Sequence, residues 1–128
     1  MTGIVIVSHS SKIAEGVCEL AGQMAPGFSA MIPVGGLEDG TLGTDPVRIM
    51  EVIRSVDQGD GVVLLADLGS GIMSAEAAME LLEGEIPVWI ADAPLVEGAV
   101  VAVVEASAGA APEEVVRAAE SARGEKKL

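Results

Sequence analysis

Short runs of apolar residues recur along the chain, and each is followed by a segment in which apolar residues have helical spacing. Apolar runs of this length, bounded by turn residues, are typical of buried strands. We therefore expect strands at Ile4–Val7, Ala30–Val34, Val62–Ala66 and Ile86–Ala91. The third run is apolar at every position, which indicates a central strand of a parallel sheet with both faces covered.

Helices are expected between and after these strands. The first has an apolar face made of Ile13, Val17, Leu20, Ala21 and Met24, and Pro26-Gly27 ends it. The second begins at Asp45-Pro46, because Asp can cap free amides and Pro is tolerated at the first helical position. Its buried face is Ile49, Ile53 and Val56. The others are expected at Ala75–Leu82 with Ser74 as the cap, at Val96–Ser107, and from Pro112 to about Arg123.

This alternation of strands and helices predicts an α/β fold. Short right-handed crossovers give a parallel four-stranded sheet, of expected order 2-1-3-4, with helices on both faces. We expect a single domain over residues 1–123 and a frayed tail over residues 124–128. In such sheets ligands bind beyond the carboxyl ends of the strands, where the strand order reverses. Here that position lies between the first and third strands.

The residues after those two strands carry the candidate chemistry. His9, the only histidine, follows the first strand, and Asp67 follows the third. An Asp beside a His accepts one ring N–H and leaves the other nitrogen as a free nucleophile. We predict His9 and Asp67 as the catalytic pair. On general grounds a lone His at a strand end is more often a structural hydrogen-bonding residue, and a lone Asp there can merely cap a turn.

The neighbouring residues suit an anion. Gly69, Ser70 and Gly71 can turn backbone amides toward a phosphoryl group. The hydroxyls of Ser10 and Thr44 can add donors. We therefore predict Ser10, Thr44, Gly69 and Ser70 as phosphoryl-binding residues.

Composition limits the alternatives. The net charge of −13 repels nucleic acids and anionic membrane surfaces, and it would attract a basic protein partner. One His and one Cys do not supply a zinc site, and we expect no metal and no cofactor. G-x-S-x-G and Walker motifs are absent. A receiver domain would need an acidic pair where His9 stands. Residues 1–8 lack signal-peptide features and no run is long enough to span a bilayer, so a cytoplasmic location is expected.

Several segments together resemble one family. They are Val5-Ile6-Val7-Ser8-His9-Ser10, Ala14-Glu15-Gly16-Val17, Gly43-Thr44, Asp67-Leu68-Gly69-Ser70 and Ala93-Pro94-Leu95-Val96-Glu97-Gly98-Ala99. The family is the phosphotransfer subunit of the phosphoenolpyruvate-dependent dihydroxyacetone kinase, within the mannose-type IIA superfamily of the sugar phosphotransferase system. The resemblance extends from about Ile4 to Arg123.

The resemblance implies a phosphotransferase of glycerol metabolism that acts as a phosphohistidine carrier. The phosphocarrier protein HPr would donate a phosphoryl group to His9. The phosphohistidine would then rephosphorylate ADP held in the nucleotide-binding subunit of the kinase. By the same resemblance Asp67 contacts the active histidine, and Gly43-Thr44 lies near it. The alternatives are a IIA component of a mannose-type transporter and a non-catalytic regulator controlled by phosphorylation.

The helix expected at Val96–Ser107 is apolar all round, because the consecutive residues Val100–Val104 point in nearly every direction. One side can pack on the sheet, and the other needs a cover. We expect a homodimer joined partly through this helix. The alternative cover is the last helix, through Val115 and Val116.

Overall fold

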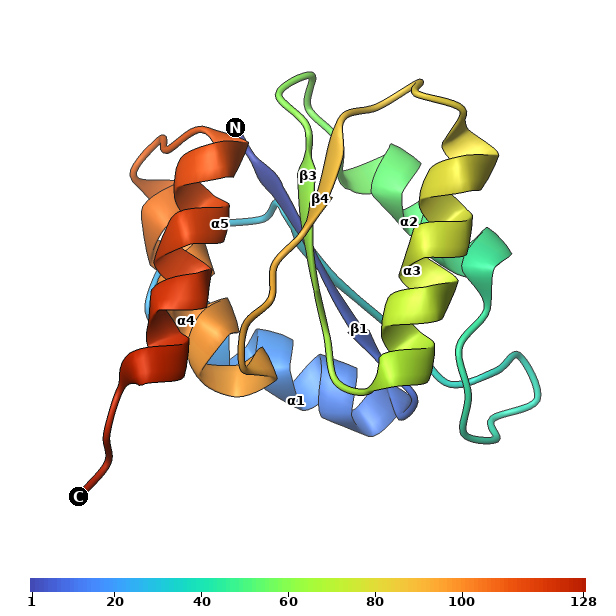
Figure 1. Cartoon of the computed structure of the whole chain (residues 1–128), viewed down its shortest axis with the longest axis horizontal. Helices are drawn as coiled ribbons and strands as arrows, with labels where there is room; N and C mark the ends of the chain where they lie inside the picture. Colours follow the sequence, from blue (N-terminus) through green and yellow to red (C-terminus); the bar gives the residue numbers. More distant parts are fainter.

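The computed structural model describes all residues from Met1 to Leu128. A four-stranded parallel sheet lies at its centre, with the strand order β2-β1-β3-β4 (Figure 1). The elements, in chain order, are β1 (Gly3–Ser8), α1 (Ser11–Gly22), β2 (Met31–Gly35), α2 (Pro46–Val56), β3 (Val62–Ala66), α3 (Gly69–Leu82), β4 (Val88–Ile90), α4 (Leu95–Ser107), α5 (Pro112–Ser121) and the short 3-10 helix η1 (Ala122–Gly124). The predicted α/β class, strand order and parallel pairing are confirmed.

The strands separate two apolar layers. Alternate residues of β1 and β3, such as Ile4 and Leu65, pack under α1, α4 and α5. The intervening residues, such as Val5 and Leu64, pack under α2 and α3 on the other face. Figure 1 shows α4 and α5 on one side of the sheet and α2 and α3 on the other. Both faces of β1 and β3 are therefore buried, as their continuous apolar sequences predict.

The register of the strands determines what meets at the carboxyl edge. Val7 of β1 pairs with Ala66 of β3, and Ser8 pairs with Gly35 of β2. The carboxyl ends of these strands are therefore in register, and the residues that follow β1 and β3 lie side by side. This brings His9 and Asp67 to the same place, although they lie far apart in the sequence.

The expected apolar face of the first helix is partly wrong. Ala14, Val17 and Ala21 are buried against the sheet. In contrast, Ile13, Leu20 and Met24 are 50%, 44% and 54% exposed. The buried stripe is made of small residues because α1 packs closely against β1, β2 and α4, and the larger side chains at its margin point to solvent.

The start of the third helix also differs from expectation. α3 begins at Gly69 rather than Ala75, and its N-cap residue, Leu68, makes no side-chain capping bond. Ser74, the expected cap, lies inside the helix and bonds to Thr44. The two glycines at its start weaken the helical signal in the sequence. By contrast, Asp45 caps α2 as predicted, accepting from the Val47 amide at 3.0 Å.

The other boundaries differ by a few residues. β4 is confined to Val88–Ile90, α1 ends at Gly22 before the Pro26-Gly27 turn, and α5 continues into η1. Residues 125–128 have no regular structure, and Lys127 pairs with Glu97 at the start of α4. None of the helices combines the length and apolar character that crossing a membrane requires.

Candidate functional site at the carboxyl edge of the sheet

His9 occupies the turn between β1 and α1. It directly follows the last residue of β1, and Ser10 ends the turn as the N-cap of α1 by accepting from the Ile13 amide at 3.3 Å. The cap fixes the path of the chain on one side of His9, and the β-sheet fixes it on the other. The His9 side chain is 22% exposed, so the ring is held in place and still open to a partner.

Asp67 lies beside this turn and receives four donors. Its Oδ1 accepts from the Leu68 amide at 2.8 Å and lies 3.1 Å from Nδ1 of His9. Its Oδ2 accepts from the Ser8 hydroxyl at 2.6 Å and from the His9 amide at 3.2 Å. Each carboxylate oxygen therefore has two partners, and the carboxylate has little freedom to rotate.

These contacts decide the charge of Asp67. Burial alone would raise the pKa of its carboxyl group, but the hydrogen bonds from Ser8, His9 and Leu68 outweigh burial and hold the pKa below its usual value. An ionised carboxylate can only accept hydrogen bonds, so Nδ1 of His9 must carry the proton of the 3.1 Å contact. The other ring nitrogen, Nε2, keeps its lone pair.

Nε2 points toward the start of α3, where it contacts the Ser70 hydroxyl. Gly69, Ser70 and Gly71 form the first turn of this helix, and no side chain caps their amides. The positive end of the helix dipole and these free N–H groups favour an anion. A ring nitrogen with a lone pair and a helix end that favours an anion thus face the same small space.

The loop between β2 and α2 closes another side of the site. The Gly43 amide donates to the backbone oxygen of His9 at 2.9 Å. The hydroxyl groups of Thr44 and Ser74 are 2.6 Å apart, which fastens this loop to α3. The structure thus brings Thr44, Gly69 and Ser70 to the neighbourhood of His9 and Asp67. Because the hydroxyls of Ser10 and Thr44 already have partners, their phosphoryl-binding role stays a prediction.

Sequence reasoning missed three contributors. It gave no role to Ser8, whose hydroxyl bonds Asp67, and it placed Ser74 at a helix cap rather than in the contact with Thr44. It also treated Gly71 only as an amide donor. A Cβ atom at position 71 would lie 3.3 Å from Oδ1 of Asp67, so the glycine leaves room for the His9–Asp67 pair. A serine directly before the strand-end histidine was the available signal for Ser8.

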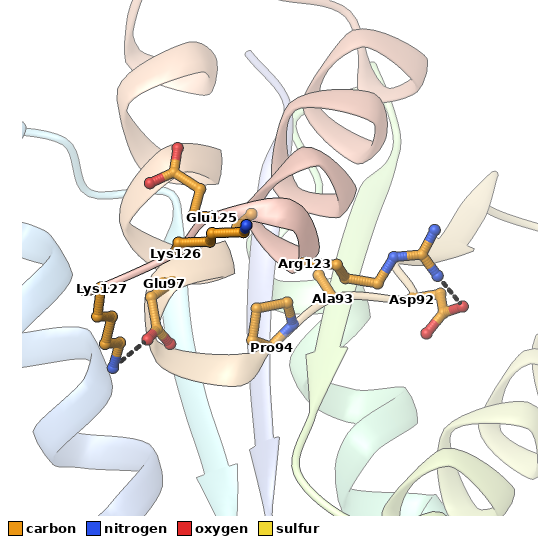
Figure 2. A pocket seen from close by; sticks show the side chains of 9 residues that line it. Asp92, Ala93, Pro94, Glu97, Arg123, Glu125, Lys126 and Lys127 are labelled. Atoms are coloured by element: carbon orange, nitrogen blue, oxygen red, sulfur yellow. Dashed lines mark hydrogen bonds and ion pairs between the residues drawn. The ribbon is translucent and has the colours of Figure 1, made fainter.

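Of the hollows along the same edge, two lie on the β4 side of the site. The first adjoins Asp67 on the β4 side and is mostly apolar, with Leu68, Ile72 and Ile90 in its wall. The second, shown in Figure 2, lies between the start of α4 and the C-terminal residues. Its charges are mostly paired, since Arg123 binds Asp92 and Lys127 binds Glu97. No group of three or more His, Cys, Asp or Glu side chains is arranged to hold a metal ion.

Comparison with known proteins identifies the family. The pattern of the EIIA-man family, described as PTS system fructose IIA component, matches residues 3–116. The chain belongs to this family. Within it the chain is of the DhaM type, because it is similar to several phosphoryl donor subunits of dihydroxyacetone kinase.

One such relative has nearly the same length as this EIIA-man chain. The phosphoryl donor subunit DhaM of PEP-dependent dihydroxyacetone kinase 2 from Listeria innocua is 40% identical over 119 residues, which cover 91% of the chain and 95% of the relative. The corresponding subunit from Escherichia coli K12 is 46% identical over 121 residues. That match covers 91% of the chain but 26% of the relative, so the chain spans about a quarter of the longer protein.

Solved structures agree on the fold of this EIIA-man chain. The crystal structure of EF1359, a protein of unknown function, is 34% identical and superposes with a TM-score of 0.83, over 98% of the chain and 96% of that protein. A phosphotransferase system component EIIA from Streptococcus agalactiae superposes with a TM-score of 0.70 at 13% identity, over 95% of the chain and 92% of that protein. The second likeness concerns the fold alone.

Proposed function

We propose that this protein is a phosphohistidine carrier. It takes a phosphoryl group from HPr onto Nε2 of His9 and passes it to ADP bound in the nucleotide-binding subunit of dihydroxyacetone kinase. The observation that carries the proposal is the contact of ionised Asp67 with Nδ1, which leaves the Nε2 lone pair facing the amides of α3. The relatives named as phosphoryl donor subunits of this kinase support the choice of acceptor.

Charging of His9 is a substitution at phosphorus. The Nε2 lone pair forms the new P–N bond while the bond between phosphorus and the leaving atom of the donor breaks, and its electron pair returns to the donor. The ring becomes positively charged because Nδ1 keeps its proton. Asp67, 3.1 Å from Nδ1, stabilises this charge. The Ser70 hydroxyl and the first amides of α3 are placed to bind the phosphoryl oxygens.

Discharge reverses these roles. A terminal phosphate oxygen of ADP attacks phosphorus, the P–N bond breaks, and the electron pair returns to Nε2. The proton on Nδ1 makes the imidazole a better leaving group, so the same Asp67 contact assists both transfers. The site needs to be open for this exchange between proteins, and His9 is partly exposed at the edge of the sheet.

Labelling tests the proposal directly. With phosphoenolpyruvate, enzyme I and HPr, the protein should gain one phosphoryl group that is labile in acid and stable in alkali, as a phosphoramidate is. His9→Ala should remain unlabelled, and label retained in this variant would refute the assignment. Adding the nucleotide-binding subunit with ADP should discharge the label. A transporter component or a regulator would keep it.

We also propose that the carrier is a homodimer and that residues 1–123 form its phosphotransfer domain. α4 packs between α1 and α5, so the last helix covers one flank of α4. Val96 and Val104 nevertheless stay 41% and 42% exposed. Leu20 of the adjacent α1 and Met24 just beyond that helix are also exposed, and we infer that these side chains offer an apolar surface that a second copy can cover.

A further inference from the structure

We propose that Ser8 is a positioning residue for phosphoryl transfer. Its buried hydroxyl orients the carboxylate of Asp67, and through that carboxylate it selects the tautomer of His9. The inference rests on the proposed phosphohistidine function, in which Nε2 of His9 must be free of a proton when it attacks phosphorus.

The contacts of Ser8 leave its hydroxyl one possible arrangement. Its Oγ is 2.6 Å from Oδ2 of Asp67 and accepts from the Ser10 amide at 3.0 Å. The hydroxyl has a single proton, and the ionised carboxylate can only accept, so that proton points at Asp67. Ser8 therefore connects the carboxylate to Ser10, the N-cap of α1, on the far side of His9.

The burial of Ser8 indicates that its hydroxyl has a specific role at this position. Ser8 is 0% exposed, and the only other buried polar residue is Thr2, at the opposite edge of the sheet. A buried hydroxyl is costly unless it is bonded, so an apolar residue would suit an ordinary core position better. Water does not reach the position to replace the hydroxyl, and no partner protein can touch it.

Close packing around Ser8 restricts the position of its backbone as well as that of its hydroxyl. β2 comes so close that a Cβ at Gly35 would lie 2.6 Å from the Ser8 backbone oxygen. The turn therefore cannot shift toward β2. On the other side of Asp67, a Cβ at Gly71 would lie 3.3 Å from Oδ1. Gly71 therefore leaves room beside Oδ1, and Ser8 holds the carboxylate on the Oδ2 side.

Loss of the Ser8 hydroxyl should free Asp67. Oδ2 would keep only the 3.2 Å bond from the His9 amide, which is the longest of the four. The carboxylate could then rotate, and the Nδ1–H tautomer of His9 would lose part of its preference. We expect fewer productive attacks by Nε2 and no change in how partners dock.

The test compares Ser8→Ala with Thr2→Val. Thr2 is 1% exposed and its hydroxyl donates to the Ala110 oxygen at 2.8 Å, so both substitutions remove one buried hydroxyl donor. Ser8→Ala also removes the acceptor of the Ser10 amide. Ser8→Ala should lower the kcat for charging about tenfold, as loss of an orienting outer contact commonly does, with the KM for HPr unchanged. Thr2→Val should lose thermal stability and keep the wild-type rate.

A second measurement reads the tautomer without any phosphorylation. Because His9 is the only histidine, a protein with nitrogen-15 in its histidine gives one pair of ring signals. Wild type and Thr2→Val should show Nδ1 protonated and Nε2 free in the neutral ring. Ser8→Ala should shift both signals toward a mixture of tautomers.

The outcomes are separable. A wild-type kcat or unchanged ring signals in folded Ser8→Ala would overturn the role of Ser8. If the Ala variant does not fold, Ser8→Cys keeps the size of the side chain with a weak donor, and the same criteria apply to it. Failure of wild-type protein to take label refutes the phosphohistidine function instead, and the ring signals still test whether Ser8 orients His9.

Discussion

Asp67 shows how much chemistry one residue can determine through its hydrogen bonds. Its four donors fix the orientation of the carboxylate and keep it ionised. His9 is thereby left with one reactive nitrogen, directed at the start of α3. In the proposed mechanism, the reactivity of the histidine thus comes from the carboxylate beside it and from the strand register that places the two together.

Asp67→Asn should keep the fold and slow the charging of His9 by about two orders of magnitude, because the neutral amide does not stabilise the positive ring. Single-turnover labelling measures the effect. Asp92→Asn is the matched control, since Asp92 also follows a strand but pairs with Arg123. If Asp67 only capped a turn, its substitution would lower stability and leave the rate close to wild type.

The lowered pKa of Asp67 also predicts a dependence of stability on pH. The ionised form is favoured in the folded protein, so its contribution to the free energy of unfolding is complete above the pKa of an unfolded Asp, about 4. This contribution is lost as the pH falls through the lower pKa of the folded state. In urea titrations, the stability advantage of wild type over Asp67→Asn should shrink between pH 5 and pH 2. A constant difference over that range would contradict the assignment.

Among the elements, α3 has the most direct influence on the site. Its first turn supplies the uncapped amides, the Ser70 hydroxyl and, at Gly71, the space for the His9–Asp67 pair. Thr44 and Ser74 join the same helix to the β2–α2 loop. A side chain added at position 71, in the first turn of α3, should therefore reach the chemistry even where it improves the helix.

Substitutions at two glycines in this turn distinguish the effect of helix stability from the effect of site geometry. Gly71→Ala puts a Cβ 3.3 Å from Oδ1 of Asp67 and 3.7 Å from Cε1 of His9, and we expect charging to slow several-fold. Gly69→Ala meets nothing within 4 Å. That variant should keep the wild-type rate and gain up to about 1 kcal/mol of stability from the better helix former. Equal rates for the two variants would show that crowding at position 71 does not matter.

The elements also show where sequence reasoning succeeds and where it stops. Apolar runs determine strands that are covered on both faces, so β1 and β3, and hence the pairing of His9 with Asp67, could be predicted. The exposure of Ile13 and Leu20 could not be predicted. Helical spacing assigns the larger apolar side chains to the buried face, whereas small residues, chiefly alanines, form the buried stripe of α1. The role of Ser8 depends on a hydrogen bond across strands, so the serine before His9 signals a polar position in the sequence but does not identify its partner.

At the scale of the whole molecule, charge is unevenly distributed. The net charge is −13, yet all of the Lys and Arg residues except Arg54 and Arg117 lie near the His9 edge. They are Lys12, Arg48, Arg123, Lys126 and Lys127. Acidic loop residues such as Asp57, Asp60 and Glu83 lie at the opposite edge. Acidic residues such as Asp45, Asp92 and Glu97 also lie at the His9 edge, so this edge differs from the opposite one in carrying most of the positive charge.

If a basic carrier docks at His9, local charge should set its association rate. Raising the salt concentration should slow association, because the net attraction is screened. Lys12→Gln removes a positive charge three residues from His9 and should speed association about twofold at low salt. Arg117→Gln, within α5, should have a smaller effect. Slower association for Lys12→Gln would instead indicate an acidic docking face on the donor.

The proposed dimer is tested by sedimentation at micromolar concentration. Wild type should be a dimer, and Val104→Glu should be a folded monomer, because the charge would be buried at the interface on α4. Val47→Glu is the matched control, since this valine is 48% exposed on α2, across the sheet. It should remain a dimer. A wild-type monomer, or a Val104→Glu dimer, would refute the interface.

The open turn at His9 has a consequence for the order of events. In the proposed cycle, one nitrogen at one edge of the sheet must meet both the protein that delivers the phosphoryl group and the protein that removes it. Two macromolecules cannot occupy that edge together, so the carrier must release the first before it engages the second. Double-reciprocal plots of the steady-state rate should then give parallel lines. An excess of either partner should inhibit turnover, because that partner would also bind the form of the carrier that reacts with the other one.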